Sequence, residues 1–472
     1  MPNHSNDPAV FDPRDPRRQI PAVPLPATVA DGFTFAVAGD LIGPVRPETP
    51  LGDPGLAEAT RVLHAADVAF ANQEGSIFDI DTFRGYRAAE HGGGYPVSDE
   101  AMAAEIRALG IDVVSKANNH ATDWGTEGLL ETRRVLDAAG VLHAGSGPGK
   151  AAARAPAMLE MRKGRVAVIA AASTFTPMSE AGNADTEIGP RPGISVVKVT
   201  PVTRLNEADM TVIRRIAATQ GCGTSIESRA SGRHERIRLG SEVFALADPG
   251  AASTDAGEPT LTHDIDGFDH VEILRSVRGA KQVSDFVAFS LHAHENRSGD
   301  GVDRRPADFV TRLAHDAIDA GADLFVTTGP HLLRGIEIYR GKPVFYGMGS
   351  LYLQFDGGRG PTLDAARAMN IDPLQFTKPE FMRACFSLPD AWYDGAIATS
   401  TFVNGCVSEI RITPLRLNRN DSGRIQGSPR VAHGDDARRI LERLRADSLE
   451  FGTQLGIDGD LGIVTTAAVP AS

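Results

Sequence analysis

The stretch that decides the fold is Ile111–Gly128, which reads IDVVSKANNHATDWGTEG. It opens with an apolar run typical of a β-strand, breaks at Asn118-Asn119-His120, and passes Asp123 before a helix expected from about residue 126. A strand that ends in amide and imidazole side chains has the layout of a metal or catalytic site, because the rigid strand delivers them to a crevice at its C-terminal end. For this motif alone, the alternative is an asparagine-rich turn with a surface histidine.

The bulk composition narrows the class of protein. The 472 residues suffice for one large domain or two, and the formal net charge of −13 argues against a general nucleic-acid binder. Three scattered cysteines, Cys222, Cys385 and Cys406, form neither a disulfide framework nor a zinc-ribbon spacing, which favours a reducing compartment. The sequence contains no apolar run of about 18 residues and no signal-peptide pattern, so we expect a cytoplasmic protein without a membrane span.

Strands and helices alternate on both sides of the motif, which is typical of the α/β class. We expect strands at 33–38, 66–71, 111–115, 165–173, 285–291 and 323–328, a hairpin at 337–347, an edge strand at 401–414, and helices at 56–66, 99–109, 126–139, 306–320 and 435–449. The predicted organisation is an extended arm at 1–30, a main domain at 31–415 and a helical extension at 416–472. The main domain would contain an insertion at about 175–265 and an irregular segment at about 357–395.

Five of the predicted strands are followed by side chains that ligate metals or catalyse proton transfer. In chain order these are Asp40, Glu74, Asn119 with His120, His292 with His294, and His331. Each has a simpler alternative; a lone aspartate, for example, can merely cap a turn. Because the C-terminal ends of strands in an open α/β sheet share one crevice, we expect these side chains to converge. Oxygen and imidazole ligands suit Mn²⁺, Fe or Zn²⁺, and two such ions could activate a hydroxide between them.

The order of these motifs resembles that of the CapA-type poly-γ-glutamate capsule synthesis proteins, which are relatives of the calcineurin-like metallophosphatases. The resemblance covers about 33–175 and 283–355. It is carried by Gly39-Asp40, Asn72-Gln73-Glu74, ANNHATDWG at 117–125, GADLFVTTGPH at 321–331 and YGMGS at 346–350. It implies a four-layer α/β/β/α sandwich of the metallophosphatase type, with a metal site between the strand ends.

The resemblance also implies a role for each candidate residue. Asp40 would bind a first metal, Glu74 would be the bridging carboxylate, Asn119 would bind a second metal, His292 and His331 would be further ligands, and His120 would act as acid/base or oxyanion partner. From the residues themselves, we also expect that Asp123 orients the His120 imidazole. The chain departs from the pattern at Ile42 and Gly329, where relatives carry histidines. His294 could replace a lost ligand, and the site could hold two metals, one or none.

Three functions stay open on the sequence. The first is a metal-dependent hydrolase of a phosphoester or of a γ-glutamyl or peptide-type amide, linked to poly-γ-glutamate metabolism. The second is a non-catalytic accessory protein of polymer synthesis. The third is a metal-dependent peptide epimerase, because lasso-peptide epimerases resemble the same family. The substrate would be a small molecule, a polymer or a peptide, and the sequence does not set the oligomeric state.

Overall fold

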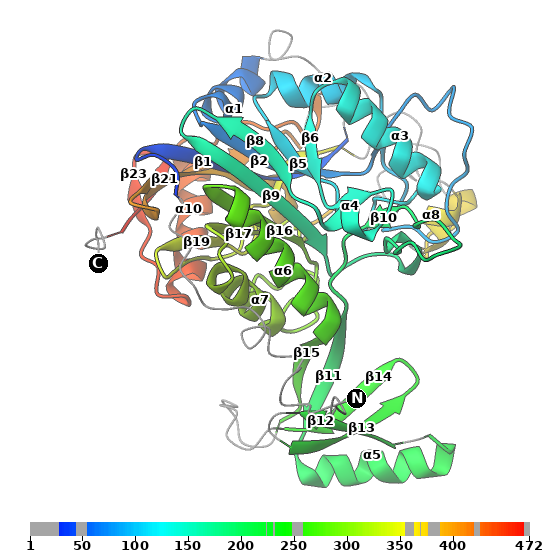
Figure 1. Ribbon diagram of the computed structural model, residues 1–472. Helices are drawn as coiled ribbons and strands as arrows, with labels where there is room; N and C mark the ends of the chain where they lie inside the picture. Colours follow the sequence, from blue (N-terminus) through cyan, green and yellow to red (C-terminus); the bar gives the residue numbers. More distant parts are fainter. Residues whose placement is uncertain are drawn as a thin grey trace, which may run out of the picture.

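The computed structural model describes residues 28–43, 54–222, 224–229, 232–247, 258–354, 363–368, 370–375, 388–419 and 425–466. Apart from its last three residues, the arm predicted at 1–30 lies outside these ranges. The described part is a mixed α/β structure with two large sheets and a smaller third one, which confirms the predicted class (Figure 1). Within these ranges, no helix is both long and apolar enough to cross a membrane.

The first large sheet has nine strands in the order β23-β24-β22-β21-β1-β2-β5-β6, with β20 also paired to β1. Its strands are β1 (Phe33–Ile42), β2 (Val68–Glu74), β5 (Val113–Ser115), β6 (Leu142–Ala144), β20 (Ser350–Leu353), β21 (Asp394–Val403), β22 (Cys406–Arg416), β23 (Gly456–Asp458) and β24 (Leu461–Thr465). Strands β1, β2, β5 and β6 run parallel, so their C-terminal ends lie at one edge. This sheet therefore brings residues near the ends of β1 and β2, and residues that follow β5, to one edge.

The second large sheet has six strands in the order β18-β19-β17-β16-β9-β8. Its strands are β8 (Ala157–Met161), β9 (Gly164–Ala172), β16 (Phe286–His292), β17 (Leu324–Thr328), β18 (Ile336–Tyr339) and β19 (Lys342–Phe345). The apolar runs of β9, β16 and β17 are parallel and form its buried middle, as expected for strands covered on both faces. Strands β18 and β19 form the predicted hairpin.

The two large sheets pack face to face across an apolar core. Phe33 and Phe35 of β1 contact Phe286 of β16, with ring centroids 5.2 and 5.4 Å apart. Helices cover the outer faces: α1 (Pro54–His64), α2 (Ala101–Ala108) and α3 (Gly125–Ala138) on the nine-stranded sheet, and α6 (Gly267–Val283) and α7 (Asp308–Asp319) on the six-stranded sheet. The buried face of α7 follows the 3.6-residue period of a helix and consists of Phe309, Val310, Leu313, Ala314, Ala317 and Ile318.

Residues 199–265 form the smaller third sheet, in the order β12-β13-β14-β11-β15, which projects away from the large sheets (Figure 1). Its elements are β11 (Val199–Leu205), α5 (Glu207–Gln220), β12 (Thr224–Arg229), β13 (Gly232–Leu239), β14 (Glu242–Leu246) and β15 (Thr260–Ile265). The remaining short elements are β3 (Ser76–Ile77), β4 (Val97–Ser98), β7 (Ser146–Gly147), α4 (Lys150–Arg154), η2 (Pro177–Ser179), β10 (Gly193–Ile194), α8 (Leu363–Ala368), η3 (Pro373–Gln375) and η4 (Asp390–Tyr393).

Two expectations about strands were wrong. The edge strand expected at 401–414 is instead parts of β21 and β22, which turn at Asn404-Gly405 and lie inside the nine-stranded sheet. Both turn residues have positive φ, which is what an Asn-Gly hairpin requires. The strands that carry the candidate site also do not belong to one open sheet, because β16 and β17 lie in the second sheet. After α10 (Gly434–Leu449), the C-terminal segment adds β23 and β24 to the first sheet.

Candidate metal centre

The ends of the two facing sheets converge on one buried cluster. The nine-stranded sheet supplies residues from β1, β2 and the turn after β5, and the six-stranded sheet supplies residues from the ends of β16 and β17. All eight candidates lie in this cluster: Asp40, Glu74, Asn119, His120, Asp123, His292, His294 and His331. Seven of them are buried and His294 is half-buried.

The Glu74 carboxylate lies at the centre of the cluster. Its Oε1 atom is 3.9 Å from Nε2 of His120, 4.0 Å from Nε2 of His292 and 3.9 Å from Nε2 of His331. Among the described residues this oxygen has no hydrogen-bond partner. Burial, and then the nearby carboxylate of Asp40, raise the pKa of Glu74 well above its usual range. A buried carboxylate oxygen faced by three imidazoles is the arrangement that a cation would complete.

Asp40 holds His331 in one orientation. The Gly329 N–H lies 3.1 Å from both carboxylate oxygens of Asp40, and Nδ1 of His331 lies 3.0 Å from Oδ2. An ionised carboxylate only accepts hydrogen bonds, so Nδ1 carries the proton and Nε2 presents its lone pair toward Glu74. His331 has φ +52°, a conformation that non-glycine residues seldom adopt and that is often found at functional sites.

Glycine is required beside Asp40. A Cβ at Gly39 would lie 1.9 Å from the carbonyl oxygen of Gly349, and the β1–β2 register shifts between Val37 and Asp40. The close approach of the segment before β20 therefore fixes where the Asp40 carboxylate lies. Glycine at 349 has its own reason, because its φ is +69° and a Cβ there would lie 2.4 Å from the carbonyl oxygen of Asp394.

His292, His294 and Asn119 form the other side of the cluster. The two Nε2 atoms of the histidines are 3.1 Å apart, and Oδ1 of Asn119 is 2.9 Å from Nε2 of His292. Burial lowers the pKa of His292 well below its usual range; burial and then the charge of His331 lower that of His294 to about 3. Both imidazoles are therefore neutral near pH 7, which is the form that binds a metal.

His120 is paired with Asp123 in the turn that follows β5. Nδ1 of His120 lies 2.6 Å from Oδ2 of Asp123, so the carboxylate accepts the Nδ1 proton and leaves Nε2 facing Glu74. The other oxygen of Asp123 accepts a hydrogen bond of 2.9 Å from the Gly92 N–H. The pair can therefore orient an imidazole toward the centre of the cluster.

These residues fit a divalent transition metal. Two triads, Asp40/Glu74/His331 and Glu74/His292/His294, each place one potential ligand atom per residue within 4.8 Å of the others. Two ligand atoms that each lie about 2.0–2.2 Å from one ion are at most about 4.4 Å apart, and the distances from Glu74 Oε1 to the three imidazoles fall inside that limit. The donors are carboxylate, amide and imidazole, which suit Mn²⁺, Fe or Zn²⁺.

Sequence reasoning missed three residues of the cluster. Asn72 donates to Asp40 at 2.8 Å and to Glu74 at 3.2 Å, and Asn118 donates to the Asn72 side-chain oxygen at 3.2 Å. Asn72 could have been found, because residues two apart on a strand share a face. The ring of Trp392, in η4, lies 4.7 Å from that of His331 and comes from a segment without a sequence signal.

Lys116 does not reach into the cluster. It is fully buried, and its ammonium donates to the carbonyl oxygens of Gly75 and Gln73. Burial lowers the pKa of Lys116 to about 8 despite the nearby carboxylate of Asp123. Its role in the structure is to hold the chain after β2 next to the turn that follows β5.

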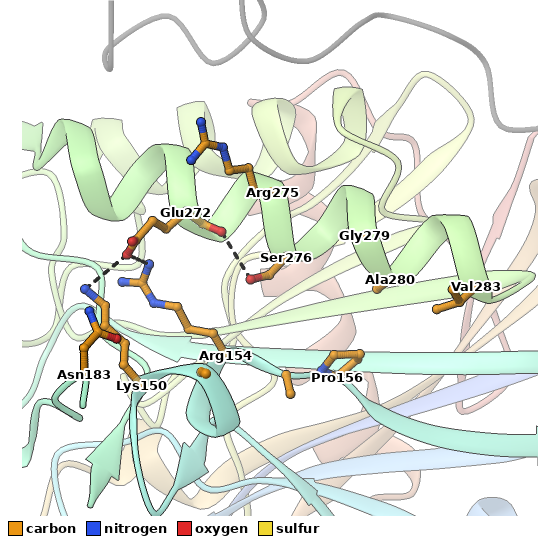
Figure 2. Close-up of a pocket in the computed structure, with 12 residues that line it drawn as sticks. Lys150, Arg154, Pro156, Asn183, Glu272, Arg275, Ser276, Gly279, Ala280 and Val283 are labelled. Atoms are coloured by element: carbon orange, nitrogen blue, oxygen red, sulfur yellow. Dashed lines mark hydrogen bonds and ion pairs between the residues drawn. The ribbon is translucent and has the colours of Figure 1, made fainter. Parts of the chain in front are cut away.

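A hollow of about 550 Å³ lies elsewhere, between α4 and α6 (Figure 2). Its cations are already paired: Lys150 is 3.1 Å from Glu272, and Arg154 contacts Glu272 and lies 2.8 Å from Asp269. None of the eight candidate residues lines it. The convergent titratable groups, which are the better guide to chemistry, lie at the strand ends.

The chain is similar to known bacterial proteins over most of its length. The family described as Bacterial capsule synthesis protein PGA_cap matches residues 34–354. The uncharacterized proteins y4sH and y4uA of Sinorhizobium fredii are each 36% identical over 452 residues, which cover 92% of this chain and 94% of theirs.

Two more distant relatives have names that refer to polymer synthesis. A probable polyglutamine synthesis accessory protein of Mycobacterium tuberculosis is 27% identical over 305 residues, 64% of this chain and 60% of its own. The PGA biosynthesis protein CapA of Bacillus subtilis is 38% identical over 87 residues, 18% of this chain and 21% of its own. The family match is therefore extensive, whereas the likeness to the named biosynthesis protein is local.

Proposed function

Because the chain belongs to the bacterial capsule synthesis protein family PGA_cap, we propose that it is a metal-dependent hydrolase of a γ-glutamyl, peptide-type or phosphoester bond, linked to poly-γ-glutamate metabolism. The observation that carries this proposal is the buried Glu74 Oε1, which has no hydrogen-bond partner among the described residues and faces three imidazoles at 3.9–4.0 Å. We also propose that the two facing sheets and their outer helices are the four-layer sandwich of the metallophosphatases.

The proposed metal would be held by residues from both sheets. Glu74 and His331, with Asp40, make one ligand group, and Glu74 with His292 and His294 makes the other. Glu74 belongs to both groups, which suits a bridging carboxylate. When bound, such an ion supplies a Lewis acid and lowers the pKa of water in its coordination sphere.

Residues of the chain itself would transfer the proton and hold the ligand side chains in position. His120 is the proposed acid/base, because Asp123 fixes its Nδ1 proton and leaves Nε2 free to give or take one at the cluster. Asp40 would hold His331 in the tautomer that presents Nε2, and Asn72 would fix the carboxylates of Asp40 and Glu74. The attacking water must lose a proton and the leaving group must gain one; the unprotonated Nε2 of His120 is the candidate that can take up the first and then deliver it to the leaving group.

Metal analysis followed by an activity panel tests the proposal. Protein purified without chelator should contain near-stoichiometric Mn, Fe or Zn, and should hydrolyse at least one member of a panel of phosphoesters and γ-glutamyl peptides. A protein that neither contains metal nor gains stability when metal is added would refute the metal centre. Bound metal without turnover would favour the second candidate, an accessory role, which is supported by the name of the mycobacterial relative.

A further inference from the structure

One residue of a loop outside the candidate site, Gly92, forms hydrogen bonds to two residues of the site. The loop lies between β3 and β4, and we call residues 87–95 the Gly92 loop. The Gly92 carbonyl accepts a hydrogen bond of 2.7 Å from Nδ2 of Asn119, and the Gly92 N–H donates one of 2.9 Å to Oδ1 of Asp123. We propose that Gly92 is a positioning residue that sets the orientation of both the Asn119 amide and the Asp123 carboxylate.

The first contact decides which atom Asn119 offers to the cluster. A carbonyl oxygen only accepts, so the Asn119 NH₂ group must face Gly92 and the amide oxygen must face His292, 2.9 Å away. Reversing the amide would place two oxygens together at Gly92. The carbonyl of Gly92 therefore fixes the amide with the atom that can bind a metal pointing inward.

The second contact fixes the partner of His120. Asp123 uses Oδ2 for His120 and Oδ1 for the Gly92 N–H, so its carboxylate is held at both oxygens. A carboxylate held in this way keeps the imidazole in the Nδ1–H tautomer and in one ring orientation. A Cβ added at Gly93 would lie 3.9 Å from Nε2 of His120, so the loop also borders the reacting end of the ring.

Close approach, not backbone conformation, explains glycine at position 92. A Cβ there would lie 2.4 Å from the carbonyl oxygen of Asn119 and 2.6 Å from its carbonyl carbon, and backbone atoms cannot move aside independently. The loop is closed by the Tyr95 hydroxyl, which donates to the carbonyl of Ala88 at 2.9 Å, and the Ala88 N–H donates to the Asp123 carbonyl at 2.8 Å. Any larger residue at 92 must push the loop away from the site.

The inference rests on the proposed function where it concerns metal binding, and the test uses two readouts that can fail separately. The first is the dissociation constant of Zn²⁺, measured by calorimetric titration of chelator-treated protein. The second is the tautomer of His120 in metal-free protein, read from imidazole ¹⁵N shifts and assigned by the signal missing in His120→Ala. The variant is Gly92→Ala, and Gly301→Ala is the matched control, because a Cβ there meets nothing within 4 Å.

Gly92→Ala should raise the Zn²⁺ dissociation constant about 10–100-fold, the range typical of lost outer-sphere partners, and should abolish the pure Nδ1–H form of His120. Gly301→Ala should match the wild type in both. A folded Gly92→Ala protein with wild-type metal affinity and an unchanged tautomer would overturn the inference. If the wild type binds none of Zn²⁺, Mn²⁺ and Fe²⁺, the metal-dependent hydrolase proposal fails, but the tautomer still decides the role of Gly92.

A second variant keeps the test decisive if Gly92→Ala does not fold. Tyr95→Phe removes only the hydroxyl that closes the Gly92 loop at Ala88. It should raise the Zn²⁺ dissociation constant at least about twofold, the change expected from one hydrogen bond that holds the loop. A Tyr95→Phe protein with wild-type metal affinity and an unchanged His120 tautomer would count against a positioning loop.

Discussion

Replacing Glu74 by glutamine should change the stability of the protein in opposite directions with and without metal. The substitution keeps the length and shape of the side chain and removes one charge from the centre of the cluster. In the metal-free protein that charge is poorly compensated, because Oε1 lacks a hydrogen bond among the described residues, Oε2 accepts only one from Asn72, and the Asp40 carboxylate is nearby. With metal bound, the same charge is the one shared by both ligand groups.

The metal-free effect follows from proton linkage. Burial raises the pKa of Glu74 in the folded state above its ordinary value of 4.5, so folding takes up a proton whenever the pH exceeds that value. The wild type therefore loses stability as the pH rises from about 4.5, by up to about 3 kcal/mol at pH 7, at 1.36 kcal/mol for each pH unit. Glu74→Gln lacks this loss, so in chelator it should be the more stable protein at pH 7, and the difference should shrink toward pH 4.5.

The effect with metal follows from mass action. At a metal concentration about 1,000 times the dissociation constant, binding stabilises the folded wild type by about 4.1 kcal/mol. If the variant binds about 100-fold more weakly, the same concentration stabilises it by only about 1.4 kcal/mol. At pH 5, where the metal-free difference is below about 1 kcal/mol, the two proteins should therefore exchange order when metal replaces chelator.

The assay is urea unfolding of both proteins at pH 5 and pH 7, in chelator and in Mn²⁺ or Zn²⁺. Glu74→Gln should unfold at higher urea than the wild type in chelator at pH 7, and at lower urea than the wild type in metal at pH 5. A variant that is less stable under both conditions would show that the carboxylate stabilises the empty site. If metal stabilises Glu74→Gln as much as it stabilises the wild type, Glu74 is not a ligand.

Three further substitutions separate roles within the fold. His120→Ala should retain its metal and lose about 10²–10⁴-fold in turnover of an identified substrate, whereas His331→Ala should lose metal, as elemental analysis would show; metal-free His120→Ala protein would reverse the two assignments. His294→Ala should bind Zn²⁺ more weakly in calorimetry, and unchanged affinity would exclude it as a ligand. Asp394→Ala should leave metal content intact but lower the free energy of unfolding by about 2–4 kcal/mol, because this buried carboxylate pairs with Arg416, Arg439 and Arg443; a loss below about 1 kcal/mol would contradict this.

The location of the site was predictable because strand ends are a local signal. An apolar run followed at once by Asp, Asn or His, as at Asp40 and His292, reports its own position without any knowledge of neighbouring strands. What the pattern could not show is which sheet each strand joins. Glu74 and His292 lie on different sheets, and the pairing of a parallel strand depends on contacts far away in the sequence.

The boundaries near the C-terminus failed for a different reason. The alternation read as a single edge strand runs through Asn404-Gly405, a strong hairpin signal that divides it into β21 and β22. Recognition of the turn would have predicted two paired strands in place of one edge strand. No comparable signal marks Gly92, because the need for glycine there comes from the backbone of Asn119, 27 residues later.

Gly329 and His294, which both follow strands of the six-stranded sheet, are close together in space. A Cβ at Gly329 would lie 2.7 Å from Cε1 of His292 and 2.8 Å from Cδ2 of His294, so a side chain at 329 and the ring of His294 compete for one volume. Gly329 also has φ +105°, which strains any other residue. From the sequence, we could only suggest that His294 replaces a ligand lost at a position such as Gly329. In the structure the two features depend on each other: glycine at 329 leaves room for the imidazole of His294, whose Nε2 lies 3.1 Å from Nε2 of His292. Restoring a histidine at 329 alone should therefore displace His294 instead of adding a ligand.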